Sequence, residues 1–355
     1  MTGRGIDQVL PHPSNPELHE PYVKNAMEYV HLAEVANGKI QKPVDFHYVW
    51  GDSLEALERI VPDARIINLE TAVTSNDRFW RGKDIHYRMH PKNIPVLEAI
   101  SPDCCVLANN HILDWGYAGL DETLSALEAA KLNFTGAGQN REQAQRPTVV
   151  PGKNRVLVFS FGTQSSGVPA DWAAGKDQAG VSLLPDYSDK TVNNIAAIVN
   201  PEKQTGDIVV ISLHWGSNWG YSISQEESRF AYKLIDVAGA DVIHGHSSHH
   251  IKGIEVYREK LILYGCGDFL NDYEGISGYE QFRDYLGLMY FPTISPIDGQ
   301  LVQLRLIPTR IERFRVKRAN EDETQWLEEV LNREGSRLGT RVERSDDGSL
   351  MLRVE

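Results

Sequence analysis

Histidines gather in one short segment of the chain. His244, His246, His249 and His250 lie within seven residues, directly after the apolar run that ends at Ile243. Imidazole nitrogens, together with carboxylate and amide oxygens, suit Mn, Fe or Zn in a catalytic site with open positions. No thiolate accompanies the histidines, which disfavours a closed structural zinc site. The segment therefore favours a ligand or catalytic role over simple core packing.

Three other apolar runs also end in polar side chains, and each run is typical of a buried strand. These runs, with the residues that follow them, are 65–69 before Glu70, 104–108 before Asn109, Asn110, His111 and Asp114, and 207–213 before His214. In open α/β sheets the ligand crevice lies beyond the carboxyl ends of the strands. We therefore expect these side chains and the histidine segment to converge on one site.

Each of these residues also has a purely structural interpretation. A single buried histidine is usually a hydrogen-bonded core residue, and Glu70 alone can form a surface ion pair. Asn109 and Asn110 can cap the turn that follows their strand. The aromatic residues of the same loops either pack the core or line a binding pocket for an extended, peptide-like substrate. They are Trp115, Trp215, Trp219, Tyr221, Phe269 and Tyr273.

Apolar runs alternate with segments of helical periodicity along most of the chain. Helices are predicted over 93–100, 120–130, 225–238 and 320–335, the third opening on a capping box at Ser224. Hairpins are predicted over 148–161 and 253–264, and a later one turns at Asp298-Gly299. This order predicts one α/β domain over 1–310, built on mixed sheets, with a C-terminal strand and helix extension over 311–355 packed on it.

Composition excludes several classes of protein. The chain has 355 residues and a net charge of −13, which disfavours a nucleic-acid binder because phosphate neutralisation needs a basic face. No apolar run is long enough to span a membrane. The first residues lack the apolar stretch of a signal peptide, and three cysteines exclude a disulfide scaffold. We expect a cytoplasmic protein.

Taken together, the motifs resemble the CapA family, the PgsA-like proteins of poly-γ-glutamate capsule synthesis. That family is similar to the calcineurin-like metallophosphatases. The matching segments are Asn68-Leu69-Glu70, Ala108-Asn109-Asn110-His111 with Asp114 and Gly116, His214-Trp215-Gly216, Gly245-His246 through His249, and Gly267-Asp268-Phe269. The resemblance implies a four-layer α-β-β-α sandwich of mixed sheets.

The resemblance also implies roles for individual residues. It assigns Glu70, Asn110, His214, His246 and His249 to a divalent metal centre of Mn, Fe or Zn, and His111 to general acid catalysis or substrate binding. Two metals can activate a water and hold a phosphoryl or acyl oxygen. We further expect Asp114 to assist His111 and Glu70 in catalysis. Substrate contacts are expected from Asn109, Arg4, Trp215 and Trp219.

Two segments depart from the family pattern. In the family, an apolar strand ending in Gly-Asp precedes a segment like Met1 to Gly5, so the opening strand and its metal-binding Asp are expected to be absent here. Asp45, His47 and Asp52 are the candidate substitutes. In the second departure, Ser247 stands where the family has a histidine.

Three functions follow from these expectations. The first is a metal-dependent hydrolase or transferase of phosphoester or peptide-like bonds, related to poly-γ-glutamate. The second is a metal-independent acid–base enzyme, such as a peptide epimerase, in which Glu70 works with His111 or His214. The third is a non-catalytic accessory component of capsule assembly. The basic run 310–318 is expected to be a solvated face, with contact to an anionic substrate as the alternative.

Overall fold

Strands and helices are both distributed along the chain in the computed structural model, which describes residues 1–355. This confirms the mixed α/β class. The helices are α1 (Met27–Asn37), α2 (Asp52–Ile60), α3 (Pro95–Glu98), α4 (Gly116–Ala129), α5 (Arg141–Gln145), α6 (Asp189–Val199), α7 (Gln225–Asp236) and α8 (Glu321–Gly335).

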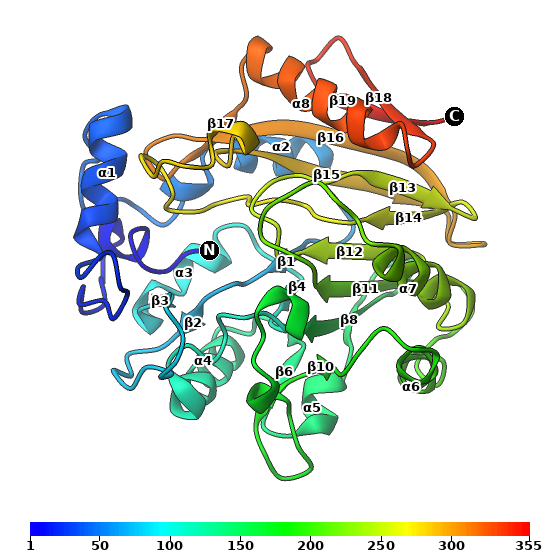
Figure 1. Ribbon diagram of the computed structural model, residues 1–355, viewed down its shortest axis with the longest axis horizontal. Coiled ribbons are helices and arrows are strands. Elements are labelled where there is room, and N and C mark those ends of the chain that lie inside the picture. Colours follow the sequence, from blue (N-terminus) through cyan, green and yellow to red (C-terminus); the bar gives the residue numbers. More distant parts are fainter.

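The largest sheet has seven strands, most of them parallel. They are β7 (Thr148–Val150), β8 (Val156–Thr163), β10 (Leu183–Leu184), β11 (Ile208–His214), β12 (Val242–His246), β13 (Ile254–Tyr257) and β14 (Lys260–Leu263). Their order is β10-β8-β11-β12-β14-β13, and β7 pairs with β8. In Figure 1, β8, β11, β12, β14 and β13 follow one another in this order up the right side of the molecule.

Because successive side chains of these strands point to opposite faces of the sheet, each face packs in a core of its own. Ile211 and Leu213 of β11 point to the face that α6 and α7 cover, in the same core as Phe230 of α7. Val210 points to the opposite face, because successive side chains of a strand alternate. Ser212 and His214 share that face with Val210. The histidines therefore belong to the face turned toward the other sheets and away from α6 and α7.

A three-stranded parallel sheet supplies the second group of site residues. Its strands are β1 (Ile66–Asn68), β4 (Cys104–Val106) and β5 (Phe134–Thr135), in the order β1-β4-β5. Asn68 pairs with Val106, so the residues after both strands leave the sheet at the same edge. Cys104 and Val106 pack in the core that also holds Val210, which brings this sheet against the seven-stranded one.

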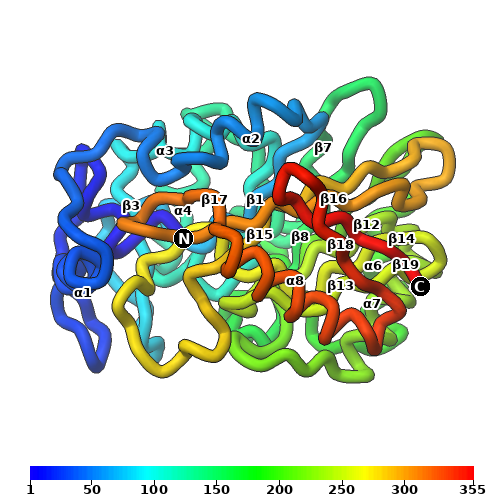
Figure 2. Tube along the Cα trace, turned by 90° about the horizontal axis from the view of Figure 1, so that it is seen from above, coloured from blue at the N-terminus to red at the C-terminus, as the bar shows by residue number.

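The C-terminal part of the chain builds an antiparallel sheet. Its strands are β15 (Leu286–Ile294), β16 (Leu301–Ile311), β17 (Val316–Arg318), β18 (Thr340–Arg344) and β19 (Leu350–Val354), in the order β15-β16-β19-β18 with β17 on β16. Segment 311–355 thus extends a sheet that β15 and β16 begin. Figure 2, viewed from above, shows α8 lying beside β18. Leu327, Val330 and Leu331 of α8 are buried, so one face of this helix packs in the core.

The remaining strands form two short pairs, β2 (Ala72–Val73) with β3 (Arg88–Met89) and β6 (Ala137–Gly138) with β9 (Gly180–Val181). The strands of the chain thus form five separate sheets. The capping box at Ser224 is confirmed, with Glu227 as its reciprocal partner. Helix α4 begins at Gly116, four residues before the predicted start. None of the helices combines the length and the apolar character needed to cross a membrane.

Candidate functional site

Two histidines meet at the carboxyl ends of β11 and β12. The parallel register pairs His214 with His246 and Ser212 with His244. Consequently the Nδ1 atoms of His214 and His246 lie 2.7 Å apart. The Ser212 hydroxyl lies 2.9 Å from His246 Nε2 and 3.0 Å from His244 Nδ1, so it bridges the two rings of β12. His214 and His246 are both buried.

Glu70 and Asn110 approach His214 from the three-stranded sheet. Asn110 Oδ1 lies 3.2 Å from His214 Nε2, and Glu70 Oε1 lies 3.8 Å from the same nitrogen. The Asn68 side-chain amide donates to Glu70 Oε2 at 2.8 Å and fixes the carboxylate. The Asn109 amide in turn donates to Asn68 Oδ1 at 3.1 Å. The buried Glu70 carboxyl and the Asn110 amide oxygen therefore both lie next to the His214 imidazole, between the two sheets.

A second group is built around the carboxylate of Asp114, which is fully buried. It lies 2.6 Å from His111 Nδ1 and accepts from the Lys83 ammonium at 2.5 Å. It also accepts from the Tyr87 backbone N–H at 2.7 Å. Lys83 additionally donates to the Asn110 carbonyl oxygen. Because an ionised Asp114 can only accept, it selects the tautomer of His111 that carries its proton on Nδ1.

His249 completes the cluster from the loop after β12. Ser247 in this loop has φ +113°, a strained conformation for a residue other than glycine. His249 Nδ1 lies 3.0 Å from Asp268 Oδ2, and the Asn271 amide donates to the same oxygen at 3.0 Å. His249 is thereby held as an ion pair with Asp268 instead of pointing free into the site.

Burial and neighbouring charges set the protonation of these groups. Burial raises the pKa of Glu70 to about 7 and lowers the pKa of His111 to about 4. Burial also holds the pKa values of His214 and His246 well below the usual range, so both rings are neutral. Burial alone would lower the pKa of His249, but the Asp268 carboxylate overcomes this and raises it.

The donor set does not fit a two-metal centre as the side chains are placed. Both ring nitrogens of His214 and of His246 already have protein partners. His249 Nδ1 is committed to Asp268. No group of three or more His, Cys, Asp or Glu side chains gathers so as to hold a metal ion. Metal binding by the five assigned residues therefore stays a prediction.

The expected substrate residues lie in different environments. Asn109 supports the Asn68–Glu70 pair from a buried position. Arg4 is buried in ion pairs with Asp272 and Glu20 and lies outside the cluster. Trp215 packs in the core on the α7 side of the sheet. Trp219 is half-buried, and its ring lies 5.3 Å from the His249 ring.

The candidate substitutes for the family's Asp do not join the cluster. Asp45 and His47 pair with each other and are mostly exposed, at 77% and 70% of their side chains. Asp52 caps the β17 backbone at Arg318. Conversely, sequence reasoning missed Lys83, which follows no predicted strand, and gave Asp268 no role. The Gly267-Asp268-Phe269 motif was the one signal that pointed to Asp268.

Comparison with known proteins gives the family. The family model described as "Bacterial capsule synthesis protein PGA_cap" matches residues 1–273. A probable polyglutamine synthesis accessory protein of Mycobacterium tuberculosis is 47% identical over 353 residues, which is 99% of this chain and 93% of that protein. The PGA biosynthesis protein CapA of Bacillus subtilis is 30% identical over 225 residues, 63% of this chain and 56% of that protein. The capsule biosynthesis protein CapA of Bacillus anthracis is 30% identical over 208 residues, 59% of this chain and 48% of that protein. The chain therefore belongs to the bacterial capsule synthesis protein family PGA_cap.

Proposed function

We propose that this chain is an accessory enzyme of capsule synthesis that cleaves or transfers peptide-like bonds of a glutamyl polymer. The choice of polymer is supported by the names of the relatives, which refer to capsule, PGA and polyglutamine synthesis. One observation carries the chemistry. The buried Glu70 carboxyl lies 3.8 Å from His214 Nε2, and the Asn110 side-chain oxygen contacts the same nitrogen. His111 directly follows Asn110 in the chain, and Asp114 orients its ring.

The two groups are suited to opposite proton transfers. Asp114 holds the proton of His111 on Nδ1, so Nε2 is free to accept a proton from an attacking water. The water oxygen then bonds to the amide carbonyl carbon. As the carbon–nitrogen bond breaks, a protonated Glu70 gives its proton to the departing amine. For transfer, an amine of an acceptor chain replaces the water.

Three other functions are alternatives for this chain. The family resemblance implies divalent-metal chemistry on phosphoester or peptide-like bonds, with Glu70, Asn110, His214, His246 and His249 as ligands. An acid and a base facing one Cα can also epimerise a residue by removing and returning its proton. A purely non-catalytic accessory role predicts no turnover at all.

Product analysis tests the proposal. Purified protein is incubated with γ-linked glutamate oligomers, and the products are resolved by mass and by chirality. Shorter or rearranged chains are expected, with their formation strongly reduced in Glu70→Gln and unchanged in Glu28→Gln, a matched change on the exposed face of α1. Unchanged oligomers would contradict the proposal, and inverted residues without cleavage would replace it with epimerisation. Metal content, measured in the same preparations, tests the ligand assignment.

A further inference from the structure

The basic run 310–318 is divided between the two faces of the five-stranded sheet. Successive side chains of β16 and β17 alternate, and Arg310 of β16 pairs with Lys317 of β17 on one face. Arg318 follows Lys317 by one position, so it lies on the opposite face. Arg305 of β16 shares that face with Arg318, because an odd number of positions separates it from Arg310.

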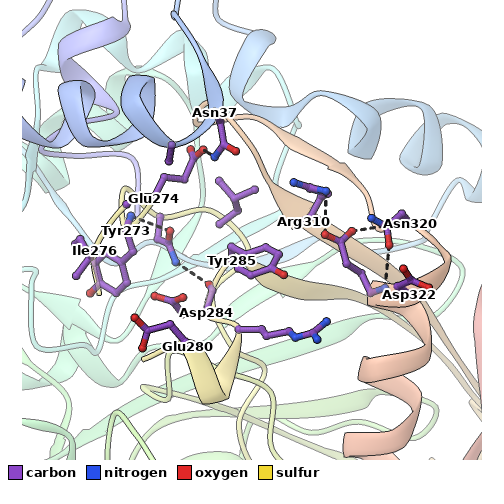
Figure 3. Close-up of a pocket in the computed structure, with 16 residues that line it drawn as sticks. Asn37, Tyr273, Glu274, Ile276, Glu280, Asp284, Tyr285, Arg310, Asn320 and Asp322 are labelled. Carbon is purple, nitrogen blue, oxygen red and sulfur yellow. Dashed lines mark hydrogen bonds and ion pairs between the residues drawn. The ribbon is translucent and has the colours of Figure 1, made fainter. Parts of the chain in front are cut away.

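The charges of Arg310 and Lys317 are neutralised within the protein. Arg310 pairs with Glu323 at 2.9 Å and with Glu312 at 3.2 Å, and Lys317 also pairs with Glu312. Figure 3 shows Arg310 in the wall of a pocket whose other labelled charged side chains are acidic. They are Glu274, Glu280, Asp284 and Asp322. A polyanion is disfavoured on this face, because these carboxylates outnumber Arg283, the other cation of the pocket wall.

On the opposite face, three arginines from separate elements meet at Asp347, in the turn between β18 and β19. Arg305 donates to the Asp347 carboxylate, and Arg59 of α2 lies 3.7 Å from the same oxygen. Arg318 donates to the Asp347 backbone carbonyl oxygen at 3.1 Å. Figure 1 shows α2, β16 and β17 together in the upper part of the molecule, above β11 and β12. We call Arg59, Arg305 and Arg318 the arginine patch.

One carboxylate does not satisfy three guanidinium groups. The Arg318 guanidinium forms no ion pair, and the 3.7 Å contact of Arg59 with Asp347 is too long for a hydrogen bond. Burial lowers the pKa of Arg318, and the charges of Arg59 and Arg305 lower it further. The arginine patch therefore carries an excess of positive charge, in a chain whose net charge is −13.

Neighbouring carboxylates do not cancel this excess. Asp52 accepts the Arg318 backbone N–H at 2.9 Å and forms no ion pair with its guanidinium. Glu55, Glu58 and Asp346 are close to the patch in the chain, but all three are exposed and none forms an ion pair with it. Exposed charges that make no contact are screened by salt, so they reduce the excess only weakly.

Several accessible guanidinium groups side by side select a partner with several carboxylates. The side chains of Arg59 and Arg305 are 52% and 33% exposed. Guanidinium groups bind carboxylates through charge-assisted hydrogen bonds, and Asp347 shows that a carboxylate fits between them. Every residue of a glutamyl chain keeps one free carboxylate, whichever of its two carboxyl groups forms the chain. One chain can therefore contact more than one arginine at once, which strengthens binding.

We propose that the arginine patch docks the free carboxylates of an extended glutamyl chain. The identity of the chain rests on the proposed function, whereas the preference for a polycarboxylate rests on the patch itself. The five-stranded sheet and α2 contribute no residue to the cluster at the strand ends. This surface is therefore a second contact for the polymer, and it holds the chain without taking part in cleavage.

The fluorescence anisotropy of a labelled γ-linked glutamate oligomer of about ten residues, titrated with the full chain, tests the proposal. Unlabelled γ-glutamylglutamate is the competitor. We expect the oligomer to bind at least tenfold more tightly than the dipeptide, because it presents more carboxylates. Raising the salt concentration from about 0.05 M to about 0.5 M should weaken oligomer binding at least tenfold through screening. An oligomer that does not bind, or that binds independently of salt, would overturn the proposal.

Two variants locate the binding site. Arg59→Gln combined with Arg318→Gln keeps the ion pair of Arg305 with Asp347 and is expected to weaken oligomer binding at least tenfold. Asp347→Asn removes the competing carboxylate and is expected to strengthen oligomer binding at least threefold. Unchanged affinity in both variants would refute the assignment.

A control double variant removes the same net charge elsewhere on the sheet. Arg341→Gln combined with Arg353→Gln replaces two exposed arginines that pair with Glu343, and we expect oligomer binding within twofold of the unmodified chain. An equal loss of binding in this control would overturn the proposal, because overall charge and not the patch would then attract the oligomer.

Two further measurements separate the inference from its alternatives. Single-stranded DNA of equal charge is the control for the class of polymer, and tighter binding of DNA that the patch variants abolish would overturn the choice of a polycarboxylate. Glu70→Gln is expected to bind the oligomer within twofold of the unmodified chain. Oligomer binding at the patch without turnover would contradict the proposed function alone, and turnover without binding at the patch would contradict this inference alone.

Discussion

Replacing Asp114 with asparagine tests the best-connected carboxylate of the cluster. Asp114 pairs with Lys83 at 2.5 Å and His111 at 2.6 Å, and it accepts the Tyr87 backbone N–H at 2.7 Å. The amide keeps one accepting oxygen, turns an N–H₂ toward a donor and leaves the Lys83 ammonium without its counter-charge. Removing one partner of a buried ion pair costs about 3–5 kcal/mol. Because the Lys83 side chain is 14% exposed, we expect the lower end, about 3 kcal/mol.

Urea unfolding followed by circular dichroism measures this loss. Asp77→Asn is the control, because Asp77 also pairs with an arginine at 2.7 Å but its side chain is 71% exposed. We expect the control to lie within about 1 kcal/mol of the unmodified chain. Lys83→Met and the double variant of Asp114→Asn with Lys83→Met complete a double-mutant cycle. We expect the two side chains to show an interaction energy of about 1–2 kcal/mol in unfolding stability. An Asp114→Asn variant within about 0.5 kcal/mol of the unmodified chain would refute the buried network.

Three further predictions concern stability. Arg4→Met should lower the free energy of unfolding by about 3–5 kcal/mol in urea titrations, because it leaves the buried carboxylates of Asp272 and Glu20 without their cation. A loss below about 1 kcal/mol would contradict the ion pairs. Ser224→Ala should cost about 1 kcal/mol by the same titration, through loss of the helix cap, whereas an unchanged midpoint would mean that the cap does not form. Burial raises the pKa of Asp284 in the folded chain to about 6, above its ordinary value, so stability falls as pH rises from the ordinary pKa to the raised one. Asp284→Asn should flatten this part of the pH profile by about 1–2 kcal/mol after allowance for partial exposure, and identical profiles would refute this expectation.

The central part of the site is predictable from short-range rules. Side chains alternate along β11 and β12, and the parallel register sets His214 directly beside His246. Glu70 and Asn110 leave one edge of the three-stranded sheet, and the packing of that sheet against the seven-stranded one places them next to His214. Apolar runs followed by polar residues are visible in one sequence, so this convergence could be predicted.

The outer part depends on contacts that no local pattern encodes. Lys83 reaches Asp114 from an irregular segment across 31 residues. His249 returns to the cluster through the strained turn at Ser247, where sequence alone suggests no positive φ. The division into three-, seven- and five-stranded sheets is likewise set by long-range strand pairing. Trp215 faces the helices because it follows His214 by one position, so it packs in the core as one of its two sequence interpretations predicts.

The central claim is that Glu70 and His111 transfer protons in one reaction on a glutamyl chain. The rate of amine release from a γ-glutamyl oligomer, compared among Glu70→Gln, His111→Gln and the double variant, tests it most directly. Groups that act as a unit have non-additive effects, so the double variant should be no slower than the slower single variant. Single variants within threefold of the unmodified chain, or a double variant whose loss is the product of the two single losses, would contradict the claim.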